Sequence, residues 1–327
     1  MMSGLRNKIM AAVRNDLEAI EIALRDNLKP HFDLVADVAG HILFNGGKRL
    51  RPLLMVLSAR LCGYQGGYDK TFSIIFEYLH AATLLHDDLV DDASVRRGKP
   101  VANSLWGNST AVLVGDFLLA RGLAIAAATQ SPDIIKVIAD ITENMSQGEI
   151  HQLSRKGALD LTEAEYLEII RCKTAVLFQG ACRISAILAG AHKMQESALS
   201  DFGYHVGMAF QMADDLLDYT FDSRTLGKTV GADLREGKLT LPVICALRKA
   251  DSEDKRRMEI LIQDENFSEN DFQWLVATLK KYDGLDYTEG FAADHVAKAK
   301  QALSAFADST TKQILLDIAD YAVERKH

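Results

Sequence analysis

Apolar residues recur at helical spacing along most of the chain. From Leu5 to Asn27 they fall on one face with charges on the other, which is typical of an amphipathic helix. Further helices are expected over about 31–44, 52–62, 70–91, 103–128, 132–153, 167–188 and 206–218. Amphipathic helices continue from Leu239 to the C-terminus, with polar turns near 264–270 and 281–286. Because no alternating strand pattern of useful length occurs, the sequence predicts an all-α fold.

The organisation of the chain favours one large domain. A length of 327 residues suits one large domain or two, but there is no low-complexity linker between segments. We therefore expect a single domain over residues 1–327. The longest stretch without helical pattern runs from Phe221 to Lys238 and is glycine-rich and polar. A mobile loop that brings Lys228 and Lys238 over a bound anion is expected there.

Four carboxylates, those of Asp87, Asp88, Asp91 and Asp92, end a strongly apolar helical segment. Residues 72–85 leave almost no polar face, so this helix is expected to be buried on all sides. Asp87 and Asp91 would lie one turn apart on the same side, where two ionised carboxylates repel each other. A cation is therefore expected between them. Ligands that are all oxygen atoms favour Mg²⁺ over Zn²⁺.

The same acidic pattern returns as Asp214, Asp215 and Asp218, again on an apolar helix. A solvated acidic helix end would explain one such motif as well as a metal site does. Two apolar helices that each carry DDxxD are harder to explain as surface accidents. A pocket that holds several divalent cations between facing acidic clusters explains both motifs.

Basic residues gather near these carboxylates. Three cations lie in Lys48–Arg51 after a glycine pair, and three more lie in Arg96–Lys99. A solvated basic turn is the alternative, but Arg and Lys beside an acidic metal site are the usual diphosphate clamps. Lys173 and Thr174 lie in apolar surroundings, where an anionic partner for the lysine is expected. A single histidine on a helix, such as His80, is more often a core or surface residue than a ligand. A role for His80 in binding therefore depends on the motifs around it.

Composition excludes several classes of protein. A net charge of −8 argues against nucleic acid as the main partner, and 48% apolar with 25% charged residues is ordinary for a soluble protein. The four cysteines have neither zinc spacing nor a disulfide framework, which suits a reducing cytosol. Residues 1–20 lack an apolar leader core, and the apolar tract 110–129 is interrupted by Asp116 and Arg121. We expect a cytoplasmic protein without a transmembrane segment.

In their order along the chain, these motifs resemble those of the trans-isoprenyl diphosphate synthase family, also called polyprenyl synthetases. The match covers roughly Phe44 to Leu241. It consists of Gly46–Pro52, His80, Asp87-Asp88-x-x-Asp91, Arg96-Arg97-Gly98, Lys173-Thr174, Gln211-x-x-Asp214-Asp215-x-x-Asp218 and Lys228. The resemblance implies a single large bundle of long helices around a central cavity, the isoprenoid synthase type, and a homodimer.

The resemblance also implies roles for single residues. The metal ligands would be Asp87, Asp91, Asp214 and Asp218. Their carboxylates would hold a cluster of Mg²⁺ ions on the diphosphate of an allylic substrate such as farnesyl diphosphate. The catalytic group would also include Asp88, Asp215 and Lys173. The allylic diphosphate would be contacted by Arg96, Lys173, Thr174, Gln211 and Lys228, with Lys238 as a further anion-binding residue. Isopentenyl diphosphate would be bound by Lys48, Arg51, His80 and Arg97.

The implied reaction is ionisation of the allylic substrate, condensation with isopentenyl diphosphate and elimination of a proton. Ala82 and Thr83 lie one helical turn before Asp87, where short-chain relatives often have aromatic residues that floor the pocket. Because both residues are small, the growing tail can pass toward Leu79, with Phe76 and Ile75 beyond it. We therefore expect a long-chain all-trans product of octaprenyl type, as used for quinone side chains.

Three alternatives remain at this stage. One is a short-chain synthase that makes geranylgeranyl diphosphate, with the floor set by other side chains. A terpene cyclase would need neither the second DDxxD nor the clamp around Lys48 and Arg51. A non-catalytic subunit of a heteromeric prenyl synthase would be favoured by loss of an Asp motif, and both motifs are intact. Because the expected product is very hydrophobic, weak association of the protein with membranes is a further alternative. No segment of the sequence encodes a membrane anchor for it.

Overall fold

The computed structural model describes residues 2–96, 98–220, 231–264 and 266–324. Helices dominate, and among the described residues the only strands are β1 (Val95–Arg96) and β2 (Lys99–Pro100), which form an antiparallel hairpin. The predicted all-α class is confirmed. The chain groups into two compact units, which are described separately.

The first unit comprises residues 1–142, 177–203 and 300–318. Its helices include α1 (Met2–Leu28), α2 (Asp33–Phe44), α3 (Leu50–Leu61), α4 (Asp69–Val90), α5 (Ala102–Trp106), α6 (Asn108–Ala128) and, from Leu177 onward, α9 (Val176–Leu188). It also contains the beginnings of α7 (Pro132–Ser154) and α10 (Lys193–Thr220), the end of α16 (Gly284–Ala302), a 3-10 turn (Leu303–Ala305) and most of α17 (Thr310–Val323).

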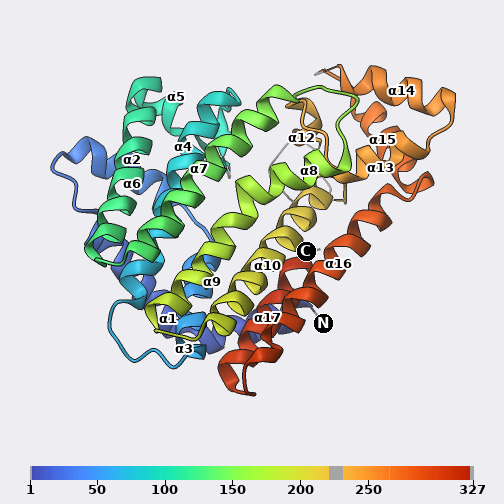
Figure 1. The fold of residues 1–327 in the computed structure, drawn as a ribbon. Coiled ribbons are helices and arrows are strands. Elements are labelled where there is room, and N and C mark those ends of the chain that lie inside the picture. Colours follow the sequence, from blue (N-terminus) through green and yellow to red (C-terminus); the bar gives the residue numbers. More distant parts are fainter. Residues whose placement is uncertain (1, 97, 221–230, 265, 325–327) are drawn as a thin grey trace. The chain divides into compact units, whose positions relative to one another are not determined.

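Helix α4 forms the centre of this unit. Helix α6 runs along it, and α3 and α1 also pack against it (Figure 1). The residues of α4 from Phe72 to Leu79 are all buried, as the apolar pattern predicts. Near the middle of the helix, the Tyr78 hydroxyl donates a hydrogen bond to the carbonyl oxygen of Leu24 on α1, at 2.6 Å.

Small residues on α6 allow its close approach to α4. A Cβ atom at Gly115 would lie 2.4 Å from Nε2 of His86, and one at Gly122 would lie 3.6 Å from Cδ2 of Leu79. Leu79 and His86 are seven residues apart and therefore share one face of α4, with Ala82 and Thr83 between them on that face. The two small residues before the first acidic motif thus belong to the face of α4 that meets α6.

The second unit comprises residues 143–176, 204–299 and the chain from Ala319 onward. It contains the later parts of α7 and α10, α8 (Glu163–Ile170), a π-helical turn (Arg171–Ala175), α12 (Ala232–Arg235), α13 (Leu241–Lys249), α14 (Ser252–Ile262), α15 (Glu269–Lys281) and most of α16. Its core combines apolar side chains of α8, α10, α13, α14, α15 and α16. A capping box begins α8, as the three-residue spacing of Thr162 and Glu165 favours, since these two residues exchange both of its hydrogen bonds.

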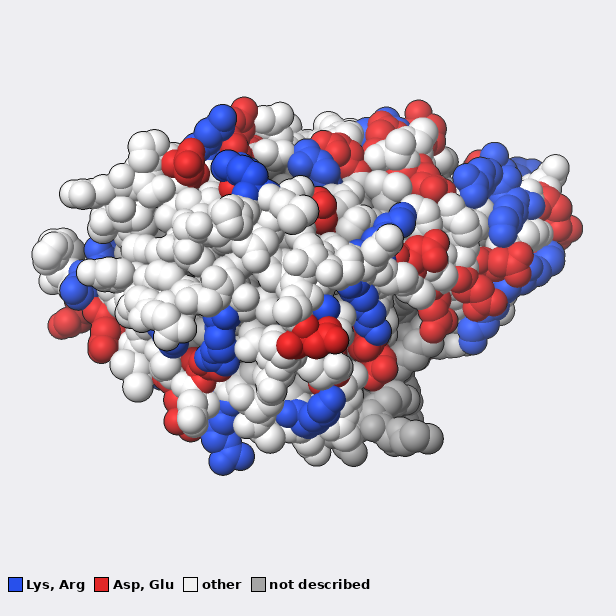
Figure 2. All heavy atoms as spheres, turned by 60° about the horizontal axis from the view of Figure 1, so that its bottom comes forward, with Lys and Arg blue, Asp and Glu red and all other residues white. Residues whose placement is uncertain are grey.

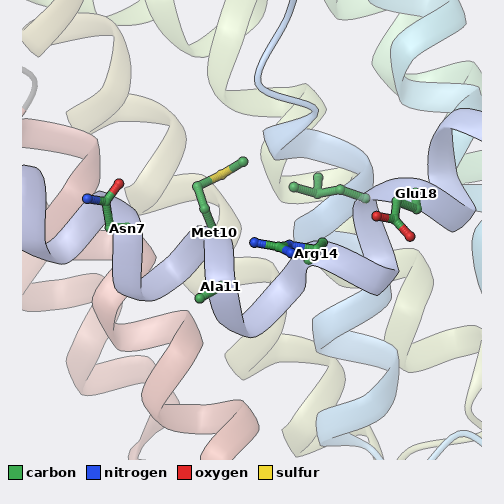
Figure 3. Close-up of a pocket in the computed structure, with 6 residues that line it drawn as sticks. Asn7, Met10, Ala11, Arg14 and Glu18 are labelled. Carbon is green, nitrogen blue, oxygen red and sulfur yellow. The ribbon is translucent and has the colours of Figure 1, made fainter.

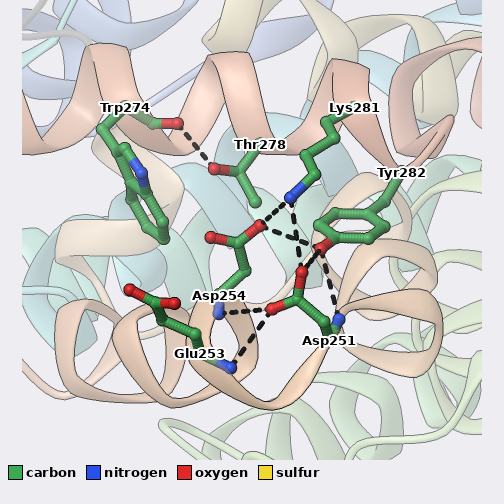
Figure 4. A network of polar contacts seen from close by, with 7 residues as sticks. All are labelled: Asp251, Glu253, Asp254, Trp274, Thr278, Lys281 and Tyr282. Carbon is green, nitrogen blue, oxygen red and sulfur yellow. Dashed lines mark hydrogen bonds and ion pairs between the residues drawn. The ribbon is translucent and has the colours of Figure 1, made fainter.

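A polar network joins the ends of α14 and α15 (Figure 4). Asp251 caps α14 by accepting from the backbone N–H groups of Glu253 and Asp254. Lys281 and Tyr282, at the end of α15, bind the carboxylates of Asp251 and Asp254. These donors lower the pKa of Asp251 to about 2. The network fixes the start of the polar turn that the sequence predicts after α15.

The structure departs from the predicted elements at three places. The helix expected over 103–128 is two helices, because Gly107 has φ of +82° and interrupts the hydrogen bonding. The helix expected over 167–188 contains the π-helical turn Arg171–Ala175. The stretch expected to lack helical structure contains the short helix α12 among its described residues.

A histidine pair within the second unit makes stability depend on pH. Nδ1 of His205 lies 2.9 Å from Nδ1 of His295. Burial, His205 and Lys298 lower the pKa of His295 to about 4, against the effect of Asp294. The unfolded chain takes up this proton near pH 6.5, so the contribution of His295 is present above that pH and is lost as the pH falls toward 4. The loss is on the order of 3 kcal/mol at most.

We therefore expect the thermal unfolding midpoint of the protein to fall as the pH is lowered from 7 to 4.5. His295→Gln keeps a hydrogen-bonding side chain but cannot titrate in this range. Its midpoint should fall less steeply over the same interval, as measured by circular dichroism. Equal slopes for the two proteins would show that His295 does not control this pH dependence.

Candidate functional site

The first acidic motif lies in the last turn of α4. Its second carboxylate, that of Asp88, is buried and accepts a hydrogen bond from Nε of Arg96 at 2.8 Å. Asp87 and Asp91 are half-buried, and the backbone N–H of Asp91 donates to the carbonyl oxygen of Asp87. The motif therefore places its first and last carboxylates nearer to solvent than its second. Arg96, expected to contact a diphosphate, lies directly beside the motif.

The basic segment before α3 divides into structural and accessible cations. Arg49 is buried, and its guanidinium donates to Glu21 at 2.5 Å, to Glu77 at 3.0 Å and to the carbonyl oxygen of Leu43. Arg49 thus joins α1, α2 and α4 and is not a free member of the expected cation cluster. Lys48 is exposed and Arg51 is half-buried.

Arg51 is positioned by an aromatic ring. Its guanidinium carbon lies 4.9 Å from the centre of the Phe178 ring, within the range of a cation–π interaction. On α4, His80 is half-buried and its carbonyl oxygen accepts a hydrogen bond from the Thr83 hydroxyl. Lys48, Arg51 and His80 all belong to the first unit.

The structure adds a link that the sequence does not reveal. Nζ of Lys99 on β2 donates to Oδ1 of Asn45 at 2.7 Å, and Nδ2 of Asn45 lies 3.0 Å from Nδ1 of His41. Nε2 of His41 lies 2.9 Å from the carbonyl oxygen of Pro100. These contacts hold the hairpin that carries Arg96 beside the loop that precedes Lys48. Lys99 counts as one more cation in the sequence, but its partner lies 54 residues away.

The second acidic motif, on α10, has the same internal arrangement. The buried second carboxylate, that of Asp215, accepts hydrogen bonds from the Tyr166 hydroxyl at 2.5 Å and from Nε2 of Gln211 at 2.8 Å. Asp214 is exposed. Asp218 is half-buried, and its two oxygens accept from the backbone N–H groups that begin α12, each at 3.1 Å. In both motifs the second Asp is buried and is bound by protein donors.

Negative charge accumulates around the second motif. Burial raises the pKa of Asp215 to about 7, and the charges of Asp214 and Asp218 add to this effect against the Tyr166 and Gln211 hydrogen bonds. Burial also raises the pKa of Asp233 on α12, together with the charges of Asp215 and Asp218. A bound cation would relieve this repulsion, and carboxylate oxygens are the donors that Mg²⁺ prefers. The donor set therefore fits a hard divalent cation.

Side chains from α8, α10 and the π-helical turn converge beside this motif. The Thr174 hydroxyl donates to Oε1 of Gln211 at 2.8 Å, so Thr174, Gln211 and Asp215 form one hydrogen-bonded chain. Nζ of Lys173 forms an ion pair with Glu149 and donates to Oε1 of Gln152 at 2.5 Å. The expected anionic partner of Lys173 is thus confirmed as Glu149. The sequence gives no local signal for Tyr166, whose partner lies 49 residues away.

Arg97 and Lys228 lie outside the described residues, and so does most of the expected mobile loop. Lys238 is described, and its Nζ lies 2.7 Å from Oε2 of Glu236. Within the described ranges, no three His, Cys, Asp or Glu side chains converge closely enough to hold a metal ion in this structure. All four cysteines are free thiols.

An open hollow of about 450 Å³ lies along α1 in the first unit (Figure 3). Its lining side chains come from one helix and include Met10, Arg14 and Glu18. None of them belongs to the motifs above, and a single helix face with one cation and one carboxylate offers no evident chemistry. The candidate functional residues therefore lie in and around each of the two acidic motifs, one in each unit.

Comparison with known proteins identifies the family. The family model for polyprenyl synthetase matches residues 32–279. The chain belongs to the polyprenyl synthetase family. This polyprenyl synthetase is 36% identical to the octaprenyl diphosphate synthase of Escherichia coli K12, over 97% of this chain and 98% of that protein. It is 37% identical to the all-trans-nonaprenyl-diphosphate synthase (geranyl-diphosphate specific) of Rhodobacter capsulatus, over 99% of each chain.

A solved structure supports the same family. The polyprenyl synthase of Caulobacter crescentus CB15, crystallised with calcium and isoprenyl diphosphate, has a TM-score of 0.92 and 37% identity, with 98% of each chain covered. The family resemblance and the isoprenoid synthase fold expected from the motifs are thereby confirmed, and the polyprenyl synthetase is a prenyltransferase.

One described helix of this polyprenyl synthetase, α6, is long and apolar enough to cross a membrane by length and composition. Its mean hydropathy over the most apolar stretch is 1.8, and 39% of that stretch is buried in the protein. Core helices of soluble proteins pass the same test, so this finding is weak evidence for a membrane span.

Proposed function

We propose that this polyprenyl synthetase is a long-chain all-trans polyprenyl diphosphate synthase of octaprenyl type. It adds isopentenyl diphosphate units one after another to an allylic diphosphate such as farnesyl diphosphate, and its product supplies quinone side chains. The observation that carries the long-chain assignment is the pair of small residues, Ala82 and Thr83, one turn before Asp87 on the α4 face that meets α6. Full-length similarity to octaprenyl and nonaprenyl synthases supports it.

The metal ligands in this proposal are Asp87, Asp91, Asp214 and Asp218, which hold a cluster of Mg²⁺ ions. Bound Mg²⁺ would supply charge stabilisation for the departing diphosphate. The proposal is supported by the parallel arrangement of the two motifs, in which the second carboxylate is bound by protein donors. Asp88 and Asp215 then contribute by fixing Arg96 and Gln211, respectively.

The remaining site residues bind and orient the two diphosphates. Arg96, Lys173, Thr174, Gln211, Lys228 and Lys238 would serve the allylic diphosphate, and Lys48, Arg51, His80 and Arg97 would serve isopentenyl diphosphate. These cations and donors stabilise the leaving diphosphate as the allylic carbon–oxygen bond breaks. The double bond of isopentenyl diphosphate then attacks the allylic carbocation, and a proton passes to the released diphosphate. Apolar side chains keep water from the cation.

The growing prenyl tail is proposed to run along α4 past Ala82, Thr83 and Leu79. Gly122 on α6 faces Leu79 and leaves no side chain in this region. Ile75 and Phe76 are fully buried and would close the path. If these two side chains stop the prenyl tail at four isoprene units, the enzyme would be a short-chain synthase that makes geranylgeranyl diphosphate.

The direct test is incubation of the purified protein with farnesyl diphosphate, labelled isopentenyl diphosphate and Mg²⁺, followed by chromatography of the products. A ladder that ends in a long prenyl chain is the expected result. A stop at four isoprene units would assign the short-chain alternative. No incorporation by the folded protein would instead favour a non-catalytic subunit of a heteromeric prenyl synthase.

We also propose a homodimer whose interface includes the outer face of α6. Val112, Leu113 and Leu123 are exposed on this face, together with alanines nearer the end of the helix, and Asp116 is the one exposed charge of the helix. An exposed apolar face of this kind marks an interaction site, and two-fold dimers are the commonest assembly of soluble proteins. A second copy of this chain is therefore expected to cover the outer face of α6.

Leu113→Glu tests this interface. Leu113 is 65% exposed, so the substitution does not disturb the core of the isolated chain. Burying the new carboxylate in a dimer should weaken association roughly 100-fold or more, as measured by light scattering with size-exclusion chromatography. Ile260→Glu on α14 is the matched control, because Ile260 is 62% exposed and should leave the dimer intact. Wild-type protein that is monomeric at micromolar concentration would contradict the proposal.

Residues 1–327 are proposed to form one polyprenyl synthetase domain, since α7 and α10 each contribute residues to both compact units. We place the enzyme in the cytoplasm, loosely associated with membranes through its product and without a transmembrane segment. Nucleic acid is not proposed as a partner. On the face drawn in Figure 2, acidic and basic side chains lie in mixed groups, and the net charge is −8.

A further inference from the structure

The π-helical turn Arg171–Ala175 directs successive side chains to different helices of the second unit. Nη2 of Arg171 donates to Oδ1 of Asn144 on α7 at 2.9 Å, Lys173 also points to α7, and Thr174 binds Gln211 on α10. A π-helical turn adds one residue to a helix and so shifts which faces the side chains occupy. The turn therefore allows Lys173 and Thr174 to face separate neighbours although they are adjacent in sequence.

Gly148 on α7 is the point where the two segments come closest. A Cβ atom at this buried glycine would lie 2.5 Å from Cβ of Cys172 and 3.2 Å from the backbone nitrogen of Lys173. Real Cβ atoms essentially never lie under 3.0 Å from such a neighbour, and ordinary contacts are 3.4 Å or longer. The nearest atom is the Cβ of Cys172, whose position is fixed by the backbone, so it cannot rotate away. Any side chain at position 148 must therefore push α7 and the turn apart.

The close approach brings two acceptors to the ammonium group of Lys173. Glu149 and Gln152 lie beside Gly148 on the same face of α7, and both bind Nζ of Lys173. The second carboxylate oxygen of Glu149, Oε1, is buried and has no hydrogen-bond partner. The ion pair with Lys173 is thus the interaction that Glu149 makes with its other oxygen. The position of the Lys173 ammonium group depends on how closely α7 approaches the turn.

We propose that Gly148 is a positioning residue for recognition of the allylic diphosphate. The proposal rests on the proposed function, in which Lys173 and Thr174 bind that diphosphate. Because residue 148 has no side chain, the π-helical turn can pack directly against α7. Lys173 and Thr174 then present their donors at a fixed spacing. Glu149 and Gln152 hold Lys173 in this position through its ammonium group.

Gly148→Ala in the full-length protein is the first test. Relief of the Cβ contact requires a shift of about 1 Å. Misplacement of a group by that distance can lower the activity of an enzyme by roughly 100-fold. We expect kcat/KM for farnesyl diphosphate to fall by about 10- to 100-fold, mainly through KM. The KM for isopentenyl diphosphate should change by less than about twofold, because its proposed ligands belong to the first unit. A general loss of folding would not separate the two substrates in this way.

Gly290→Ala is the matched control. Gly290 lies on α16 in the same unit, and a Cβ atom there would meet nothing within 4 Å. The substitution makes the same chemical change within a helix, and all kinetic constants should match those of the wild type. Unchanged constants in Gly148→Ala as well would overturn the proposal, while an active wild type would leave the proposed function standing.

Gln152→Ala decides the question if Gly148→Ala does not fold by circular dichroism. It removes one acceptor of the Lys173 ammonium from a half-buried position without adding atoms. We expect the KM for farnesyl diphosphate to rise about fivefold, equivalent to the loss of one hydrogen bond, with the KM for isopentenyl diphosphate unchanged. An unchanged KM for farnesyl diphosphate would overturn the proposal. Failure of the wild type to incorporate isopentenyl diphosphate would instead refute the proposed function.

Discussion

Replacing Asp87 by Asn should lower kcat for prenyl transfer by roughly 1,000-fold, because it removes a charged ligand from the proposed Mg²⁺ site. Asn keeps the size of the side chain and an oxygen donor but removes the negative charge that attracts the cation. The Mg²⁺ concentration needed for half-maximal activity should rise together with the loss of kcat. Both quantities can be measured by incorporation of labelled isopentenyl diphosphate over a Mg²⁺ titration.

Asp92→Asn is the matched control for this prediction. Asp92 belongs to the same acidic cluster, but it is exposed and has φ of +49°, a conformation that Asn adopts readily. Its substitution should change kcat by no more than about twofold. Equal losses in the two variants would show that the cluster acts through its total charge, and an active Asp87→Asn enzyme would remove Asp87 from the metal site.

The contrast between Asp87 and Asp88 also shows how far the sequence alone can lead. The acidic motif at the end of an apolar helix is visible in the pattern, because the helical period and the run of buried residues are local properties. The pairing of Asp88 with Arg96, and of Asp215 with Tyr166, depends on tertiary contacts across 8 and 49 residues. Sequence analysis could therefore group the carboxylates, but it could not separate the buried ones from the accessible ones.

Arg49 and the π-helical turn show the same limit. Arg49 reads as one of three adjacent cations, yet it is bound by Glu21 and Glu77, each 28 residues away on a different helix. The segment Arg171–Ala175 contains no Gly or Pro that would break an ordinary α-helix, and its π-helical form accompanies close contact with Gly148. By contrast, the capping box at Thr162 and the break at Gly107 result from local chemistry, and the first of these was predictable from residue spacing.

The second large effect concerns product length, and Thr83→Tyr should shorten the main product by several isoprene units. Thr83 is half-buried, so a tyrosine ring can be accommodated with less strain than a phenylalanine at the buried Ala82, where overpacking would cost about 1–3 kcal/mol. Both positions lie between Leu79 and His86 on the α4 face that meets α6, in the proposed path of the tail. A ring at position 83 would block this path one turn before the acidic motif.

The measurement is chromatography of labelled products from farnesyl diphosphate and isopentenyl diphosphate, with Ala82→Phe as a second blocking variant. Thr83→Val is the control, because valine has nearly the volume of threonine but lacks its hydroxyl, and it should leave the long product unchanged. If Thr83→Tyr and Ala82→Phe both shorten the product while Thr83→Val does not, bulk in the tail path limits elongation. If all three enzymes make the wild-type product, the tail does not pass this face of α4, and the residues that set chain length lie elsewhere in the fold.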